Sequence, residues 1–261
     1  MKVVTEYWLF NKIVSMLNEF KDEITLQFTN DGLKVVAMDD PRVAQIRFFV
    51  DKSNFKSYEA LEDPIKVSTK QLKERMRGTF KDVNLVTMEV DLVKSVQMKI
   101  DVSTPFGHRT IGVPVLEPEE QDISDMGRGE PSQIQKDVMV KAFVGAIEDA
   151  VEDAKKVEMA VHYEGRHNPD RFVMWNTKAG EFLSSWSEFV DKMSMMGLKT
   201  TLPKVRTATG TEYPALIMRA GSLFTDVVKI WFGDDMPVAF DFQLPFNGYL
   251  KFFVAPWISK D

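Results

Sequence analysis

The sequence predicts an α+β protein built from two similar halves, and three observations lead to this fold class. Apolar residues recur at helical spacing near the start of each half, over residues 8–20 and 140–151. Stretches in which apolar and polar residues alternate follow these helices, as is typical of half-buried strands. An acidic stretch containing Pro118 and Gly127 lies between the halves and indicates a connector. Each half is therefore expected to bury a sheet under its own helices.

The connector sets the expected domain boundaries. We place the first domain at residues 1–115, the connector at residues 116–132 and the second domain at residues 133–261. Local matches indicate an internal duplication. Asp82-Val83 precedes a predicted strand in the first half, and Asp226-Val227 precedes one in the second.

The first half is expected to contain two helices and six strands. Its first helix covers residues 8–20, and Asn30-Asp31-Gly32 supplies the turn of the hairpin that follows. Ser68 is a plausible N-cap for the second helix, which we expect at residues 68–80. The predicted strands cover residues 24–28, 33–38, 43–50, 83–90, 96–102 and 109–115.

The second half repeats this order. Helices are expected at residues 140–151 and 212–220, and Pro214 is tolerated in the first turn of the latter. The predicted strands cover residues 157–163, 171–175, 227–232, 238–242 and 250–254.

Composition excludes several classes of protein. The 261 residues are 44% hydrophobic, which is enough for a substantial core. The absence of cysteine excludes disulfides, zinc–thiolate sites and cysteine nucleophiles, and it favours an intracellular location. Residues 1–10 lack the apolar stretch of a signal peptide, and no apolar run is long enough to span a bilayer. We therefore expect no membrane partner.

The charges are unevenly distributed along the chain. A net charge of −6 would repel DNA if it were spread uniformly. Residues 66–81, however, carry six cations and one acid, whereas residues 113–131 carry six acids and one cation. Only the first stretch suits contact with phosphates.

Four stretches of the chain, in order, resemble the proliferating cell nuclear antigen (PCNA) family, the trimeric DNA clamps of archaea and eukaryotes. They are LQFTNDGLKVVAMDDPRV at residues 26–43, RTIGVPVLEPEE at 109–120, DDMPVAF at 234–240 and YLKFFVAP at 249–256. The resemblance implies two clamp domains per chain, each with an outer β-sheet and two inner helices. It also implies a pseudo-sixfold trimeric ring around duplex DNA, with no catalytic activity and no cofactor.

The helix expected at residues 68–80 is the most informative segment for DNA contact. Leu72, Met76 and Phe80 form one apolar stripe, and a separate basic stripe includes Lys70 and Lys73. An ordinary solvated helix is the alternative interpretation. In the family the matching face lines the hole, so the resemblance implies contact with phosphates that is independent of base sequence. The full set of candidate DNA-facing residues is Lys12, Lys70, Lys73, Arg75, Arg77, Lys81, Lys204, Arg206 and Arg219.

The resemblance also implies a pocket under the connector in which partners insert a short peptide motif. The expected partners are a DNA polymerase, a clamp loader, a flap endonuclease and a DNA ligase. Plain core is the alternative role for Met38, Val43 and Val254. The candidate pocket residues are Met38, Val43, Ile123, Met236, Pro237, Val254, Ala255 and Pro256.

Two other functions stay open at this point. Glu148, Asp149 and Glu152 stand where many relatives have basic residues, which leaves room for a specialised or checkpoint-type subunit of a heterotrimer. From another class, Asp39-Asp40 and Asp234-Asp235 could serve a metal-dependent nuclease. Nothing supplies a third or fourth ligand at a recognisable spacing, so we expect no metal.

Overall fold

The computed structural model describes residues 1–61, 63–76, 85–90, 96–104, 107–118, 134–139, 156–162, 171–177, 205–210, 212–233 and 236–256. The chain forms two compact units, each assembled from segments distant in sequence. The first comprises Met1–Asp125, Arg219–Thr225 and Phe242–Lys251, and the second comprises Met126–Met218, Asp226–Asp241 and Phe252–Asp261. The domain boundaries expected at residues 115 and 133 stay a prediction.

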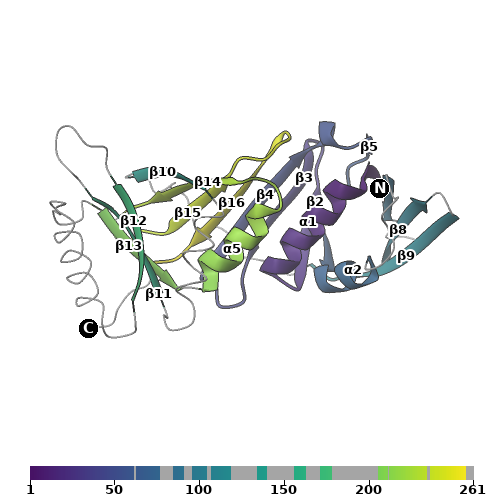
Figure 1. The fold of residues 1–261 in the computed structure, drawn as a ribbon. Helices are drawn as coiled ribbons and strands as arrows, with labels where there is room; N and C mark the ends of the chain where they lie inside the picture. Colours follow the sequence, from purple (N-terminus) through teal and green to yellow (C-terminus); the bar gives the residue numbers. More distant parts are fainter. Residues whose placement is uncertain are drawn as a thin grey trace. The chain divides into compact units, whose positions relative to one another are not determined.

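Among the described residues up to 118, the first unit is built on antiparallel strands with two α-helices (Figure 1). From β4 onward its strands follow the order β4-β3-β2-β6-β9-β8-β7-β1-β5. Its elements are β1 (Lys2–Glu6), α1 (Tyr7–Phe20), β2 (Glu23–Phe28), β3 (Gly32–Met38), β4 (Ala44–Asp51), β5 (Ser57–Tyr58), β6 (Ile65–Ser68), α2 (Thr69–Arg75), β7 (Leu85–Val90), β8 (Gln97–Thr104) and β9 (Gly107–Leu116).

The later part of the chain adds seven strands and a helix within the described residues. In the second unit, β10 pairs with β14, and β11 pairs with both β12 and β13. These elements are β10 (Ile134–Met139), β11 (Lys156–His162), β12 (Arg171–Thr177), β13 (Val205–Gly210), α5 (Glu212–Ser222), β14 (Val227–Phe232), β15 (Val238–Phe242) and β16 (Gly248–Val254). The helix expected at residues 140–151 lies outside the described residues.

Helix α1 follows the predicted apolar pattern. It starts one residue before the expected position and ends at Phe20, as predicted. Leu9, Ile13 and Leu17 are buried, and they recur every fourth residue on one face. The opposite face is left for polar side chains, so the burial of one stripe decides what the helix presents to solvent.

The predicted hairpin forms between β2 and β3. Phe28 lies opposite Leu33. Thr29 and Gly32 exchange two backbone hydrogen bonds, of 2.9 and 3.2 Å, across Asn30 and Asp31. Gly32 has a φ of +152°, which side-chain-bearing residues rarely adopt.

Helix α2 begins as predicted but ends earlier. The Ser68 hydroxyl caps it by accepting a hydrogen bond of 3.2 Å from the Gln71 amide. Leu72 and Met76 are buried, as the apolar stripe predicted. The helix ends at Arg75 and Met76 is its C-cap, whereas residues 77–80 of the predicted helix lie outside the described residues.

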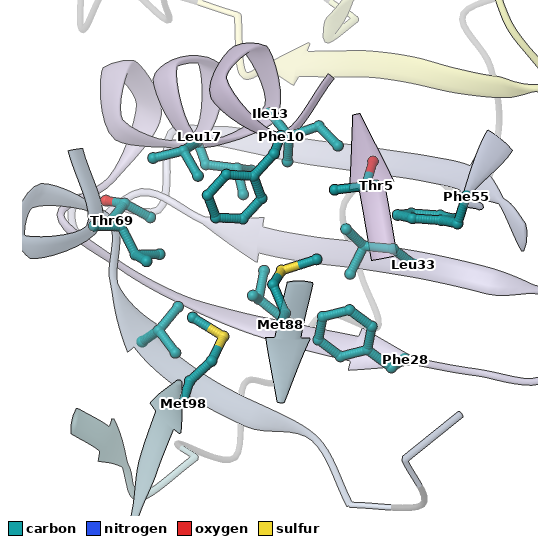
Figure 2. Close-up of a pocket in the computed structure, with 14 residues that line it drawn as sticks. Thr5, Phe10, Ile13, Leu17, Phe28, Leu33, Phe55, Thr69, Met88 and Met98 are labelled. Carbon is teal, nitrogen blue, oxygen red and sulfur yellow. The ribbon is translucent and has the colours of Figure 1, made fainter. Parts of the chain in front are cut away.

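The core of the first unit lies between α1 and the strands. Figure 2 shows Phe10, Ile13 and Leu17 of α1 on one side of a small cavity and strand residues such as Met88 and Met98 on the other. The cavity is about 20 Å³ and its exposed lining is entirely apolar. A space of this size is a packing void in the core rather than a ligand site.

Short strands were the main omissions of the sequence-based prediction. Strands β1, β5, β6, β10 and β13 were not predicted. Strand β9 lies between β8 and β6, so it is not an edge strand along its whole length. Strand β6 pairs with β9 only through Val115 and Leu116, which leaves the earlier part of β9 paired with β8 alone among the described strands.

Replacing Gly32 by Ala should destabilise the chain more than replacing Gly107 by Ala. Both glycines have positive φ, so both changes incur backbone strain of about 1–3 kcal/mol. A Cβ at Gly32 would also lie 2.1 Å from the Val50 carbonyl oxygen, whereas nothing lies within 4 Å at Gly107. Urea unfolding should therefore give a clearly lower free energy of unfolding for Gly32→Ala. Equal values would show that the hairpin can shift away from β4.

Candidate functional site

The candidate cations of the first unit come from α1, α2 and the end of α5. Lys70 is exposed on α2, and its side chain forms no hydrogen bond or ion pair with the residues that the structure describes. Lys73, one turn later, is one-third exposed, and its Nζ lies 3.3 Å from Oε1 of Glu19 on α1. Arg219 of α5 is 57% exposed, and its Nε lies 3.7 Å from Oε2 of the same carboxylate. The structure thus brings Lys73 and Arg219 together on Glu19.

Arg75 is positioned differently from Lys70 and Lys73. Its Nη1 donates a hydrogen bond to the backbone carbonyl of Gly112 on β9. The guanidinium therefore lies against the strand, although the side chain as a whole is exposed. Arg75 can contribute positive charge near α2, but its hydrogen-bonding capacity is partly occupied within the chain.

Lys12 of α1 lies over two aromatic rings. Its Nζ is 5.7 Å from the ring centroid of Trp8 and 5.9 Å from that of Phe224. Trp8 is 45% exposed, and its ring lies 6.5 Å from that of Phe246. The quadrupoles of these rings attract the ammonium group. Lys12 is thus held at the helix surface, and no acid among the described residues forms an ion pair with it.

The other candidate cations are placed only in part. Arg206 lies on β13, where its Cα pairs with that of Ala160 on β11. Arg77, Lys81 and Lys204 lie outside the described residues.

Sequence analysis did not predict the role of Glu19. This residue lies 54 positions from Lys73 in the sequence and still farther from Arg219. No local pattern joins residues at such separations. One indication was present in the sequence, since Glu19 is an acid in the last turn of the amphipathic helix predicted at residues 8–20, which also carries the candidate DNA-facing residue Lys12.

The candidate pocket residues fall in two groups, one in each unit. Met38 and Val43 belong to the first unit and are partly exposed. In the second unit Met236 is 40% exposed, whereas Val254 is fully buried and therefore fits the alternative role as core. Pro237, Ala255 and Pro256 are partly exposed. Ile123 lies outside the described residues.

The loop between Met38 and Val43 is shaped by Asp39. Its Oδ1 accepts hydrogen bonds of 2.8 Å from the backbone amides of both Val43 and Ala44. Lys21 fixes the neighbouring residues, since its Nζ lies 2.8 Å from Asp40 and 3.3 Å from the Met38 carbonyl oxygen. The hydrogen bond and charge of Lys21 hold the pKa of Asp40 below its ordinary value.

These contacts argue against a nuclease centre at Asp39-Asp40. One carboxylate is used by backbone amides and the other by an ammonium group. No group of three or more potential metal ligands occurs among the described residues. Asp234 and Asp235 lie outside them. Among the described residues, no helix is both long and apolar enough to cross a membrane.

No family model matches the chain, but curated relatives match it along nearly its whole length. It is 27% identical to DNA polymerase sliding clamp 2 of Sulfolobus acidocaldarius, over 95% of each chain. It is 24% identical to the DNA polymerase sliding clamp of Pyrococcus furiosus, over 96% of this chain and 95% of that one.

Solved structures show the same fold. The PCNA2–PCNA3 complex of Sulfolobus tokodaii matches with a TM-score of 0.71 at 21% identity, over 98% of this chain and 99% of that one. PCNA of Thermococcus kodakaraensis matches with a TM-score of 0.73 at 16% identity and the same coverage. The predicted α+β clamp fold is thereby confirmed.

Replacing Asp39 by Ala should loosen the loop that carries Met38 and Val43. The change removes two hydrogen bonds to a charged acceptor, and the free energy of unfolding should fall by about 1–3 kcal/mol. Hydrogen exchange at the Val43 and Ala44 amides should accelerate. Asp39→Asn retains an acceptor oxygen, and Asp40→Ala removes the ion pair with Lys21 but no hydrogen bond to the Val43 and Ala44 amides, so both should accelerate exchange at these amides less. Unchanged amide exchange in Asp39→Ala would mean that Asp39 does not shape the loop.

Proposed function

We propose that this chain, which belongs to the PCNA family of DNA polymerase sliding clamps, is a subunit of a ring that holds a polymerase on duplex DNA. The main support for this proposal is sequence similarity to curated sliding clamps over about 95% of both chains, together with the shared fold. Such a subunit has no catalytic step. It acts by raising the effective concentration of its partners, because a protein tethered to DNA does not diffuse away.

The candidate lysine and arginine side chains that the structure describes are suited to attracting DNA without recognising its bases. Lys70 and Lys73 come from α2 and Arg219 from α5, and Lys73 and Arg219 both contact the carboxylate of Glu19. Lysine and arginine contacts with phosphates contribute affinity through counterion release and carry no sequence information. A subunit with a net charge of −6 can still attract DNA locally, since charges beyond about 10 Å are largely screened by salt.

The ring itself is part of the proposal. We assign a trimer made with copies of this chain or with related chains. The numbered clamps among the relatives, and the solved PCNA2–PCNA3 complex, support assembly with related chains. Because a closed ring pairs two different surfaces of each subunit, strand edges such as the part of β9 before Val115 are natural candidates for pairing across subunits.

We further propose that partners dock at the candidate pocket through short peptide motifs. Met38, Val43 and Met236 offer partly exposed apolar side chains, and methionine adapts readily to different ligands. The resemblance adds Ile123, Pro237, Ala255 and Pro256 to the residues proposed for peptide docking. The partners that we propose to dock there are a DNA polymerase, a clamp loader, a flap endonuclease and a DNA ligase.

Replacing Lys70 and Lys73 together by Gln should weaken duplex binding and its dependence on salt. Each phosphate contact contributes roughly −0.9 to the slope of log affinity against log salt, so losing two should flatten it by up to about 1.8. Fluorescence anisotropy of a labelled duplex at several salt concentrations measures this slope. Folding should change little, because both residues lie off the buried Leu72 and Met76 face.

The matched control changes Lys34 and Lys99 to Gln. These exposed lysines lie on β3 and β8, and the double variant has the same net charge as the helix variant. Its salt slope should stay near that of the unmodified chain. Equal slopes for the two double variants would remove α2 from the DNA surface.

A further inference from the structure

We propose that Glu19 competes with DNA phosphates for Lys73 and Arg219, and so limits how tightly the chain holds duplex DNA. This inference rests on the proposed function, because it concerns the same DNA-facing surface. It assigns to an acidic residue a role opposite to that of the cations around it.

The geometry places one carboxylate between two of the candidate cations. Oε1 of Glu19 lies 3.3 Å from Lys73 Nζ, and Oε2 lies 3.7 Å from Arg219 Nε. Each oxygen therefore serves a different cation, and the two cations come from different helices, α2 and α5. A phosphate that approaches either cation must displace this carboxylate oxygen or share the cation with it.

Exposure shows that these ion pairs can be displaced. The side chains of Glu19 and Lys73 are each 33% exposed, and that of Arg219 is 57% exposed. Partly solvated ion pairs of this kind contribute little to stability. The triad is therefore better suited to setting the availability of the cations than to holding the helices together.

Glu19 also adds a negative charge at the position that phosphates would approach. Like charges at short range repel, and water and salt screen partly exposed groups incompletely. The carboxylate thus opposes DNA in two ways, by occupying two cations and by repelling the phosphate. Weak binding is useful in a ring, because the topological link retains the DNA while loose contacts permit sliding.

The test replaces Glu19 by Gln, which keeps the size of the side chain and removes its charge. Duplex binding, measured by fluorescence anisotropy, should tighten by about fivefold for each ion pair released, the size expected of a partly exposed pair. The salt slope should steepen by up to about 1.8, because two cations become free for phosphates. Glu19→Ser serves as a second neutral variant should the Gln variant fold poorly.

The matched control is Glu74→Gln. Glu74 is exposed on α2 and no ion pair is recorded for it in the described part of the chain, so the variant changes net charge equally without releasing a cation. Its binding should tighten less than that of Glu19→Gln. A double-mutant cycle adds a sharper readout: Lys73→Gln should weaken binding more in the Glu19→Gln background, where Lys73 is free, than in the unmodified chain.

Two outcomes would overturn the inference. If Glu19→Gln binds no more tightly than Glu74→Gln while the Lys70/Lys73 double variant still weakens binding, the competition is absent but the DNA surface stands. If neither neutral variants of Glu19 nor the double variant alters the salt slope, the proposed DNA surface itself is wrong, and the inference fails with it.

Discussion

The packing of α1 against the sheet of the first unit is the contact on which the candidate site depends. Leu9, Ile13 and Leu17 are buried along one face of this helix. Helical geometry then fixes the positions of the remaining side chains, so Lys12 and Glu19 are presented away from the core. Helix α2 is anchored in the same way through Leu72 and Met76, which leaves Lys70 and Lys73 outside. The apolar stripes thus decide which charges can meet a ligand.

Most of the described cations on this surface already interact with other groups of the chain, so fewer are free for phosphates than the row of lysines and arginines suggests. Of the cations that the structure describes with their side chains, Lys12 lies over aromatic rings, Lys73 and Arg219 contact Glu19, and Arg75 contacts a backbone carbonyl. Lys70 is the one for which the described residues supply no contact. A protein that must hold DNA and still move along it benefits from such contacts within the chain, since strong ion pairs with phosphates would oppose sliding.

Much of the fold could be predicted from the sequence because periodicity is a local property. The predicted strands at residues 227–232 and 238–242 match β14 and β15 to the residue. Strand β6 escaped notice because four residues are too few to show a period, and β1 because it runs directly into α1. The predicted end of α2 followed an apolar stripe that continues to Phe80, whereas the helix ends at Arg75.

The candidate site was predictable in its cations but not in their partners. The basic stripe on α2 was visible from spacing, and family resemblance pointed it toward DNA. The contacts of Lys73 with Glu19 and of Arg75 with Gly112 join residues 54 and 37 positions apart, so they depend on the tertiary fold. The hydrogen bonds of Asp39 with the Val43 and Ala44 amides also could not be predicted from the sequence. They give Asp39 a role in shaping its loop rather than in binding a metal.

The most direct test of the sliding-clamp function is retention on closed circular DNA. The chain, assembled with any related subunits and loaded onto a nicked circle by a clamp loader, should remain on the circle through gel filtration. Cutting the circle once should release it, because a ring slides off a free end. Equal retention on circular and linear DNA would mean ordinary surface binding and would contradict the account, as would failure to stay on the circle at all.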